Sequence, residues 1–266
     1  MSIQALYTAA TGMNSMQAKL DVISNNLANA ETTGFKSARA NFEDLFYRQE
    51  KYPGAQDSAS QYTPVGIAYG TGSRVQSTQN NFTQGSLQQT GNSLDVAIQG
   101  NGFFQVKDPS GTIYYTRAGN FSQNAAGNIV VGSANIGRLL EPAITIPNDA
   151  SNITVNAEGV VSYRTPTSQT LQQAGTIQLA NFINPQGLLQ LGENLFQETD
   201  ASGTAQTANP GQTGMGTTQQ GSLEQSNVDP VGSLIDLITT QRAFEMNSQT
   251  IKAGDEAMQT ITGLFR

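Results

Sequence analysis

Apolar residues recur at intervals of seven at both ends of this 266-residue chain. Near the start they are Leu6, Met13, Leu20 and Leu27, and near the end they are Leu237, Phe244, Ile251, Met258 and Phe265. A sustained seven-residue repeat is typical of helices that pack on other helices as coiled coils. We therefore expect a long helix at each terminus, with the two helices pairing as a coiled coil.

Capping residues indicate where these helices begin and end. The N-terminal helix should end near Asn29 to Gly34, where Glu-Thr-Thr-Gly supplies turn chemistry. Asp229 followed by Pro230 is typical of an N-cap and a first helical residue, and that helix should run nearly to Arg266. Because neither apolar stripe is wide enough to fold a helix alone, we expect the opposite terminus and neighbouring copies to cover it. An ordinary hairpin of two helices within one chain is the alternative.

The middle of the chain is rich in short β-type segments separated by turns. The runs with Ile, Val, Phe and Tyr include GFFQVKD from Gly102, TIYYTRAG from Thr112 and VVSY from Val160. We expect an α+β protein in which an all-β domain is inserted between the helices. The expected divisions are 1–46, N-terminal helix and turn paired with 227–266; 47–66, extended polar insertion; 67–226, β-rich central domain with neck segments; and 227–266, C-terminal helix.

Two similar segments bracket this β-rich region: TQGSLQQTGN begins at Thr83 and TQQGSLEQSN at Thr218. Such a pair fits two strands meeting at a neck, although chance similarity of polar segments is the alternative. Composition indicates irregular structure in two other polar stretches. We expect residues 47–66 to be a loop or linker and residues 201–221 to be a connecting loop.

Composition argues against several functions. The net charge is −7, which disfavours nucleic acid, and no apolar run is long enough for direct membrane insertion. The first residues lack the pattern of a cleaved signal peptide. Histidine and cysteine are absent, which removes the usual general base and the thiolate ligands. We interpret the adjacent carboxylates Glu43-Asp44 and Asp255-Glu256 as solvated surface, and we expect no catalytic residues, cofactor or metal.

Five motifs, in order along the chain, resemble the rod and hook family of flagellar axial proteins. They are SNNLANAETTGFK from Ser24, LDVAIQGNGFFQV from Leu94, YTRAGNF from Tyr115, GLLQLGENL from Gly187, and SNVD from Ser226 with QRAFEMNSQTI from Gln241. FEDLFYRQEKYPGAQ from Phe42 resembles a segment of distal-rod members that hook members lack. The chain departs from the family at Phe244, where Tyr is frequent.

The resemblance implies a structural subunit of the distal rod, which polymerises into a helical tube that transmits motor torque to the hook. It implies a place in the flagellar basal body within the periplasm. The implied partners are copies of this chain, proximal-rod and hook proteins, cell-wall and outer-membrane ring proteins, and the flagellar type III export apparatus. Two alternatives are a proximal-rod or hook subunit, and a secreted coiled-coil/β fibre or adhesin.

Three groups of residues are assigned roles. The assembly interface comprises Leu6, Met13, Leu20, Asn25, Asn26, Leu27, Leu237, Phe244, Ile251, Met258 and Phe265, with helix capping as the alternative for the asparagines. The family-motif turn is Gly34, Phe35 and Lys36, where Gly34 should take a positive φ. The rod insertion is Tyr52, Pro53, Gly54, Ala55 and Gln56. We hypothesise that the insertion lies along neighbouring subunits and stiffens the tube; a flexible tether is the alternative.

Overall fold

The computed structural model describes residues 3–54, 56, 62, 64–131, 137–166 and 168–264. The chain divides into two compact units, each built from separate stretches of sequence. Unit 1 comprises Met1–Ala28, Ala38–Asn80 and Asp229–Arg266, and unit 2 comprises Asn29–Ser37 and Asn81–Val228. A helix near each end with a β-rich region between them confirms the expected α+β class.

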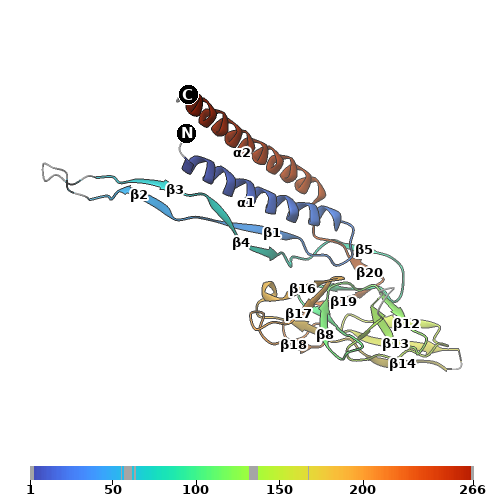
Figure 1. Ribbon diagram of the computed structural model, residues 1–266. Helices are drawn as coiled ribbons and strands as arrows, with labels where there is room; N and C mark the ends of the chain where they lie inside the picture. The colour runs from blue at the N-terminus through green and yellow to red at the C-terminus, as the bar shows by residue number, and fades with distance from the viewer. Residues whose placement is uncertain are drawn as a thin grey trace. The chain divides into compact units, whose positions relative to one another are not determined.

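Unit 1 contains the two long helices, α1 (Ile3–Ala28) and α2 (Pro230–Leu264), which lie side by side (Figure 1). Their limits agree with the sequence prediction. The Asp229 Oδ1 atom accepts a hydrogen bond of 3.1 Å from the Val231 amide, which confirms Asp229 as the N-cap of α2. Phe265 lies outside the described residues.

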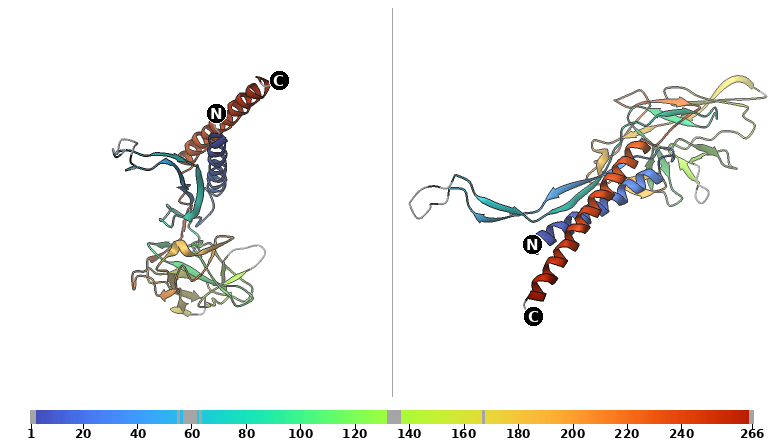
Figure 2. Two further views of the ribbon diagram at one scale, coloured as in Figure 1. Left: turned by 60° about the vertical axis from the view of Figure 1, so that its left-hand side comes forward. Right: turned by 90° about the horizontal axis from the view of Figure 1, so that it is seen from above.

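Unit 1 also contains two antiparallel ribbons. Strand β1 (Ala38–Asp44) pairs with β4 (Ser73–Asn80) and packs on α1, and β2 (Tyr47–Lys51) pairs with β3 (Ile67–Gly70). Figure 2 shows the β2–β3 ribbon as an arm that extends away from the helix pair. The prediction of a loop is therefore wrong for residues 47–51. Pairing along this arm uses backbone groups and does not require the apolar alternation that marks a strand in sequence.

Unit 2 is built almost entirely of short antiparallel strands. Its largest sheet has nine strands, with the path β16-β17-β8-β7-β11-β10-β9 and with β15 pairing both β7 and β18. These strands are β7 (Phe103–Lys107), β8 (Ile113–Thr116), β9 (Phe121–Gln123), β10 (Ile129–Val131), β11 (Arg138–Leu140), β15 (Leu179–Asn181), β16 (Leu189–Gly192), β17 (Leu195–Gln197) and β18 (Gln206–Ala208). A 3₁₀ turn, Pro185–Gly187, precedes β16.

Three smaller sheets are also present in the described part of unit 2. They are β12 (Asn152–Val155), β13 (Val160–Thr165) and β14 (Ser168–Thr176) in one sheet, β6 (Val96–Gln99) with β19 (Thr217–Gln220), and β5 (Leu87–Gln89) with β20 (Ser222–Glu224). The last pair joins the two similar segments of the sequence, so the predicted meeting of these strands is confirmed. The expected loop 201–221 is wrong in part, because β18 and β19 lie within it.

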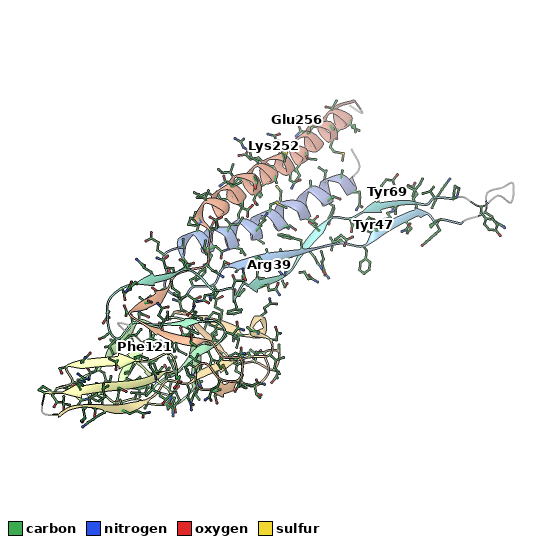
Figure 3. The ribbon with its side chains drawn as sticks, turned by 180° about the vertical axis from the view of Figure 1, so that it is seen from behind. Arg39, Tyr47, Tyr69, Phe121, Lys252 and Glu256 are labelled. Carbon is green, nitrogen blue, oxygen red and sulfur yellow. The ribbon has the colours of Figure 1, made fainter. Side chains whose placement is uncertain are left out.

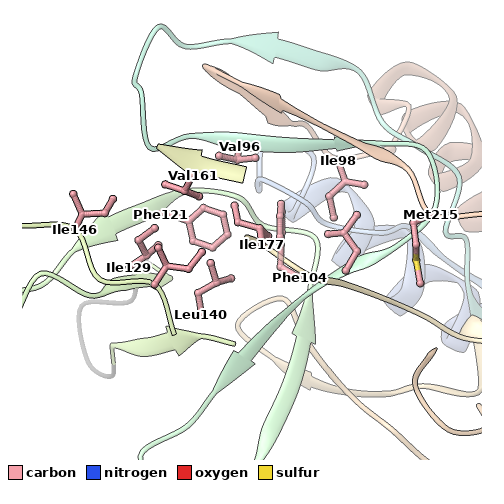
Figure 4. Packing of buried hydrophobic residues seen from close by; sticks show 12 residues of the cluster. Val96, Ile98, Phe104, Phe121, Ile129, Leu140, Ile146, Val161, Ile177 and Met215 are labelled. Carbon is pink, nitrogen blue, oxygen red and sulfur yellow. The ribbon is translucent and has the colours of Figure 1, made fainter. Parts of the chain in front are cut away.

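The hydrophobic core of unit 2 consists of aliphatic and aromatic side chains from several of these sheets (Figure 4). Phe104 packs edge-to-face on Phe121, with ring centroids 5.0 Å apart. A second cluster, around Phe103, Tyr115 and Phe196, lies on the other side of the same strands. Two adjoining clusters give unit 2 a core of its own.

Candidate functional site

Three charged side chains from distant parts of the sequence meet inside unit 2. The Glu224 carboxylate lies 2.6 Å from Lys36 Nζ and 3.4 Å from Arg117 Nη1. Their side chains are 0%, 1% and 3% exposed respectively, so the cluster is withdrawn from solvent. We call these three residues the buried charged cluster. One carboxylate faces two cations here, which leaves a net positive charge in the interior.

Neutral groups stabilise the excess positive charge. Lys36 Nζ donates a 2.9 Å hydrogen bond to the Thr83 carbonyl, and Arg117 Nη1 donates one of 3.0 Å to the Gly100 carbonyl. The Arg117 guanidinium also stacks over the Phe103 ring, 5.2 Å from its centroid. Arg117 Nε has no hydrogen-bond partner in the described part of the chain. Burial lowers the pKa of both Lys36 and Arg117, and the Glu224 carboxylate opposes that shift.

The predicted family-motif turn supplies one member of the cluster. Gly34 has φ +71°, as expected, and its amide donates a 2.8 Å hydrogen bond to the Glu224 carbonyl. A Cβ atom at Gly34 would lie 2.7 Å from the Ala118 nitrogen, so only glycine fits. Phe35 is buried beside it. Sequence reasoning found the turn but missed Arg117 and Glu224. Each of these two residues is the charged residue of an otherwise uncharged motif, Arg117 in YTRAGNF and Glu224 in TQQGSLEQSN. That exception is the signal by which they could be found.

The predicted assembly residues of α1 and α2 differ in their exposure. Leu6, Met13, Leu20, Leu27, Leu237, Phe244 and Ile251 are partly buried, whereas Met258 is exposed. Small residues bring the helices close together: Gly254 faces Leu6, and Gly12 faces Asn247. Leu6 thus packs against α2 within one chain, and the role of the assembly positions between chains stays a prediction.

The two predicted asparagines behave differently. Asn26 is buried, its Nδ2 donates to the Ala38 carbonyl at 2.7 Å, and its Oδ1 accepts from the Ala38 amide at 2.9 Å. It therefore fixes the start of β1 against the end of α1 within its own chain. Asn25 is exposed on the same helix.

A second apolar face of α2 is exposed. Val231, Leu234, Ile235 and Ile238 are between 46% and 67% exposed, at spacings of three, four and seven residues. This spacing places all four on one side of the helix. We call them the α2 outer stripe. The spacing of these four residues is visible in the sequence. The seven-residue repeat, however, indicates a different side of α2 as the packing face.

The β2–β3 arm carries exposed aromatic side chains. Tyr47 and Tyr69 lie on its two strands (Figure 3), and Phe46 at its base is 94% exposed. Tyr52 and Tyr62 are also exposed further along the arm. Of the predicted rod insertion, Tyr52, Pro53, Gly54 and Gln56 are exposed, and Ala55 lies outside the described residues.

Neither a metal-binding group nor a membrane-spanning helix is found among the described residues. They contain no group of acidic side chains placed to hold a metal ion. Neither α1 nor α2, as far as the structure describes them, is long and apolar enough to cross a bilayer.

These features define a class of protein: a structural subunit with packed terminal helices, apolar surfaces on a helix and an arm, and a β domain that contains a buried charged cluster. Three family models match the chain. They are the flagella basal body rod protein at residues 6–36, the flagellar hook protein FlgE/F/G D1 domain at 97–163, and the C-terminal region of the flagellar basal body rod FlgEFG protein at 219–264. Each member of the buried charged cluster falls within a different match.

Full-length relatives agree with these matches. The flagellar basal-body rod protein FlgG of Caulobacter vibrioides is 45% identical over 263 residues, covering 98% of this chain and 99% of the relative. FlgG of Buchnera aphidicola is 42% identical over 260 residues with the same coverage. The flagellar hook-basal body complex protein FlhP of Bacillus subtilis is 30% identical over 272 residues.

The chain belongs to the flagellar basal-body rod and hook protein family, and it is most like the FlgG rod proteins. It is a structural component of the flagellar basal body. The expectation of a structural and not a catalytic role is confirmed by these relatives, which are rod proteins.

Proposed function

We propose that this chain is a distal-rod subunit, which polymerises with copies of itself into a helical tube that transmits motor torque to the hook. The observation that carries the proposal is the α2 outer stripe, a contiguous apolar helix face left exposed in a single chain. Exposed apolar patches of this kind mark surfaces that bind other proteins. In a chain similar to rod proteins over its whole length, a second copy of the same chain is the natural occupant.

The helices provide both parts of such an interface. Residues of the seven-residue repeats hold α1 against α2, while the outer stripe is free to contact a neighbour in the same polymer. Packing of α1 and α2 with the helices of neighbouring copies would extend the repeats into a coiled-coil wall. We assign residues 1–46 and 227–266 to this wall, residues 47–66 to the insertion, and residues 67–226 to the β domain.

The β2–β3 arm provides a second contact. Every residue of its two strands is exposed, and an isolated two-stranded ribbon is marginally stable in water. Contact with a neighbouring copy would bury Phe46, Tyr47 and Tyr69 and hold the arm straight. This is why the arm would stiffen the tube and not merely connect two segments.

The remaining partners follow from this role. A distal-rod subunit in the periplasm contacts proximal-rod and hook proteins at its two ends and turns inside the cell-wall and outer-membrane ring proteins. It reaches this place through the flagellar export apparatus. The low charge of the chain, 12% charged residues, suits broad contacts between identical surfaces because like charges are few.

The test is an in-frame deletion in the source bacterium, with basal bodies purified and viewed by electron microscopy. We expect a truncated rod without outer rings or hook, restored by the intact gene but not by a gene encoding Ile235→Asp. A full rod that lacks only the hook would identify a hook subunit instead. A complete rod and hook would remove this chain from the rod and favour a fibre or adhesin.

A further inference from the structure

We propose that the buried charged cluster is a latch that holds together the segments by which the chain enters and leaves unit 2, and so positions the points where α1 ends and α2 begins. The entering segment is residues 29–37, directly after α1. The leaving segment is residues 222–228, directly before α2. The inference goes beyond self-assembly, because it concerns how one chain is organised.

The two segments are joined by a continuous set of bonds within unit 2. The Gly34 amide donates to the Glu224 carbonyl at 2.8 Å, and Lys36 Nζ donates to Glu224 Oε1 at 2.6 Å. The Ser37 amide donates to Asn227 Oδ1 at 2.7 Å. Three residues at the end of the entering segment, Gly34, Lys36 and Ser37, are thus attached to the leaving segment.

The neck segment near residue 83 is bound into the same structure. The Gly85 amide donates a 2.9 Å hydrogen bond to Glu224 Oε1, the atom that also receives Lys36. Asn227 Nδ2 donates to the carbonyls of Asn81 and Thr83, at 2.8 and 3.1 Å. Glu224 and Asn227 therefore tie three separate stretches of chain together.

The charges of Lys36, Arg117 and Glu224 restrict this junction to two states. Burying a cation without a partner is strongly unfavourable, so Lys36 and Arg117 can both be buried only when Glu224 lies between them. Without Glu224 the two cations would gain hydration by moving apart, and the entering segment would leave its position. The junction is thus either closed and dry or open and hydrated.

The latch matters because the two helices are far apart in sequence. Lys36 and Glu224 are 188 residues apart, and α1 and α2 lie just outside them. When the latch is closed, the end of α1 and the start of α2 are held near each other. This raises the effective concentration of one helix for the other. Lys36, Arg117 and Glu224 are in this sense positioning residues for the helix pair.

The absence of cysteine from the sequence allows a direct test. Cysteines introduced at Ala28 and Val231, both exposed in unit 1, are unique sites for spin labels. The distance distribution between the labels is measured by pulsed electron paramagnetic resonance in the full-length monomer. Glu224→Gln should broaden the distribution at least twofold, and Lys36→Met should broaden it less. Glu245→Gln, at an exposed ion pair of α2, is the matched control and should leave the width unchanged.

Amide exchange of residues 103–116 reports in the same samples whether the β core remains folded. A distribution as narrow in Glu224→Gln as in the parent would overturn the latch. Loss of core protection in Glu224→Gln would also overturn it, because the cluster would then be part of the core. An unchanged width in Lys36→Met would remove Lys36 from the latch. Because the measurement uses monomer, these outcomes are independent of polymerisation.

Discussion

Glu224 Oε1 lies 2.6 Å from Lys36 Nζ, although 188 residues separate the two along the chain. Arg117 approaches the other carboxylate oxygen of Glu224 at 3.4 Å, so a single anion serves two buried cations. Because of this imbalance, removing the anion and removing a cation have different effects on the buried charge. Removing the anion leaves two cations together, whereas removing Lys36 leaves one balanced pair.

Glu224→Gln should lower the free energy of unfolding by about 3–5 kcal/mol, the typical cost of breaking a buried ion pair. Lys36→Met should cost less, because Glu224 keeps Arg117 as its partner. Urea denaturation of the purified monomer, followed by circular dichroism, measures both. Glu245→Gln breaks an exposed pair and should cost less than about 1 kcal/mol. Equal losses in Glu224→Gln and Lys36→Met would contradict the charge imbalance.

Tyr115 should make stability depend on alkaline pH. Burial, reinforced by the Glu198 carboxylate, raises the pKa of Tyr115 from 10.0 to about 12. Between these values the unfolded chain loses the phenolic proton and the folded chain keeps it, so stability falls as pH rises. The contribution is complete below pH 10, and its loss amounts to about 3 kcal/mol at most.

The measurement is the difference in unfolding free energy between the parent and Tyr115→Phe across this pH range. Lys36 acts in the opposite direction, because burial lowers its pKa, and taking the difference removes its effect. A phenolate absorbance change for Tyr115 centred at its ordinary pKa would disagree with this account.

Gly34→Ala should destabilise unit 2 for two separable reasons. An alanine at φ +71° costs roughly 1–2 kcal/mol, and its Cβ would collide with the backbone at Ala118. Gly91 has a similar φ of +76° but open space around it, so Gly91→Ala measures the first cost alone. Thermal unfolding should therefore show a larger loss for Gly34→Ala. Similar losses would mean that the close approach to Ala118 is easily relieved.

Ile235→Asp should abolish polymerisation without unfolding the monomer, because Ile235 is 57% exposed in a single chain. Polymer formation is followed by light scattering and electron microscopy, and monomer stability by thermal unfolding. Thr250→Asp adds the same charge to an exposed polar position of α2 away from the outer stripe and should polymerise normally. Unimpaired polymerisation of Ile235→Asp would exclude the outer stripe from the interface.

Removal of residues 49–63 should make the rod bend, if the arm stiffens the tube. The matched control replaces the same residues with a Gly-Ser segment of equal length, which preserves connectivity but removes the exposed side chains of Tyr52 and Tyr62. Rod curvature in electron micrographs is the measurement. Straight rods from the deleted chain would favour a flexible tether.

Features that depend on neighbouring residues were predictable. The seven-residue repeats and the Asp229-Pro230 cap identified both helices, because helix formation and capping involve contacts within a few residues. The positive φ of Gly34 follows similarly from turn chemistry. Pairing of β5 with β20 was foreseen only because the two segments resemble each other in sequence.

Features that depend on distant residues needed the tertiary structure. The polar strand β2 carries no apolar alternation, so only its pairing with β3 reveals it. Asn26, assigned to the assembly interface or to capping, instead bonds both backbone groups of Ala38. Sequence alone determined which segments are helical and placed Lys36 in a turn. Only the fold decided that Lys36 is buried against Glu224 and Arg117, because burial of charge depends on groups brought together across nearly the whole chain.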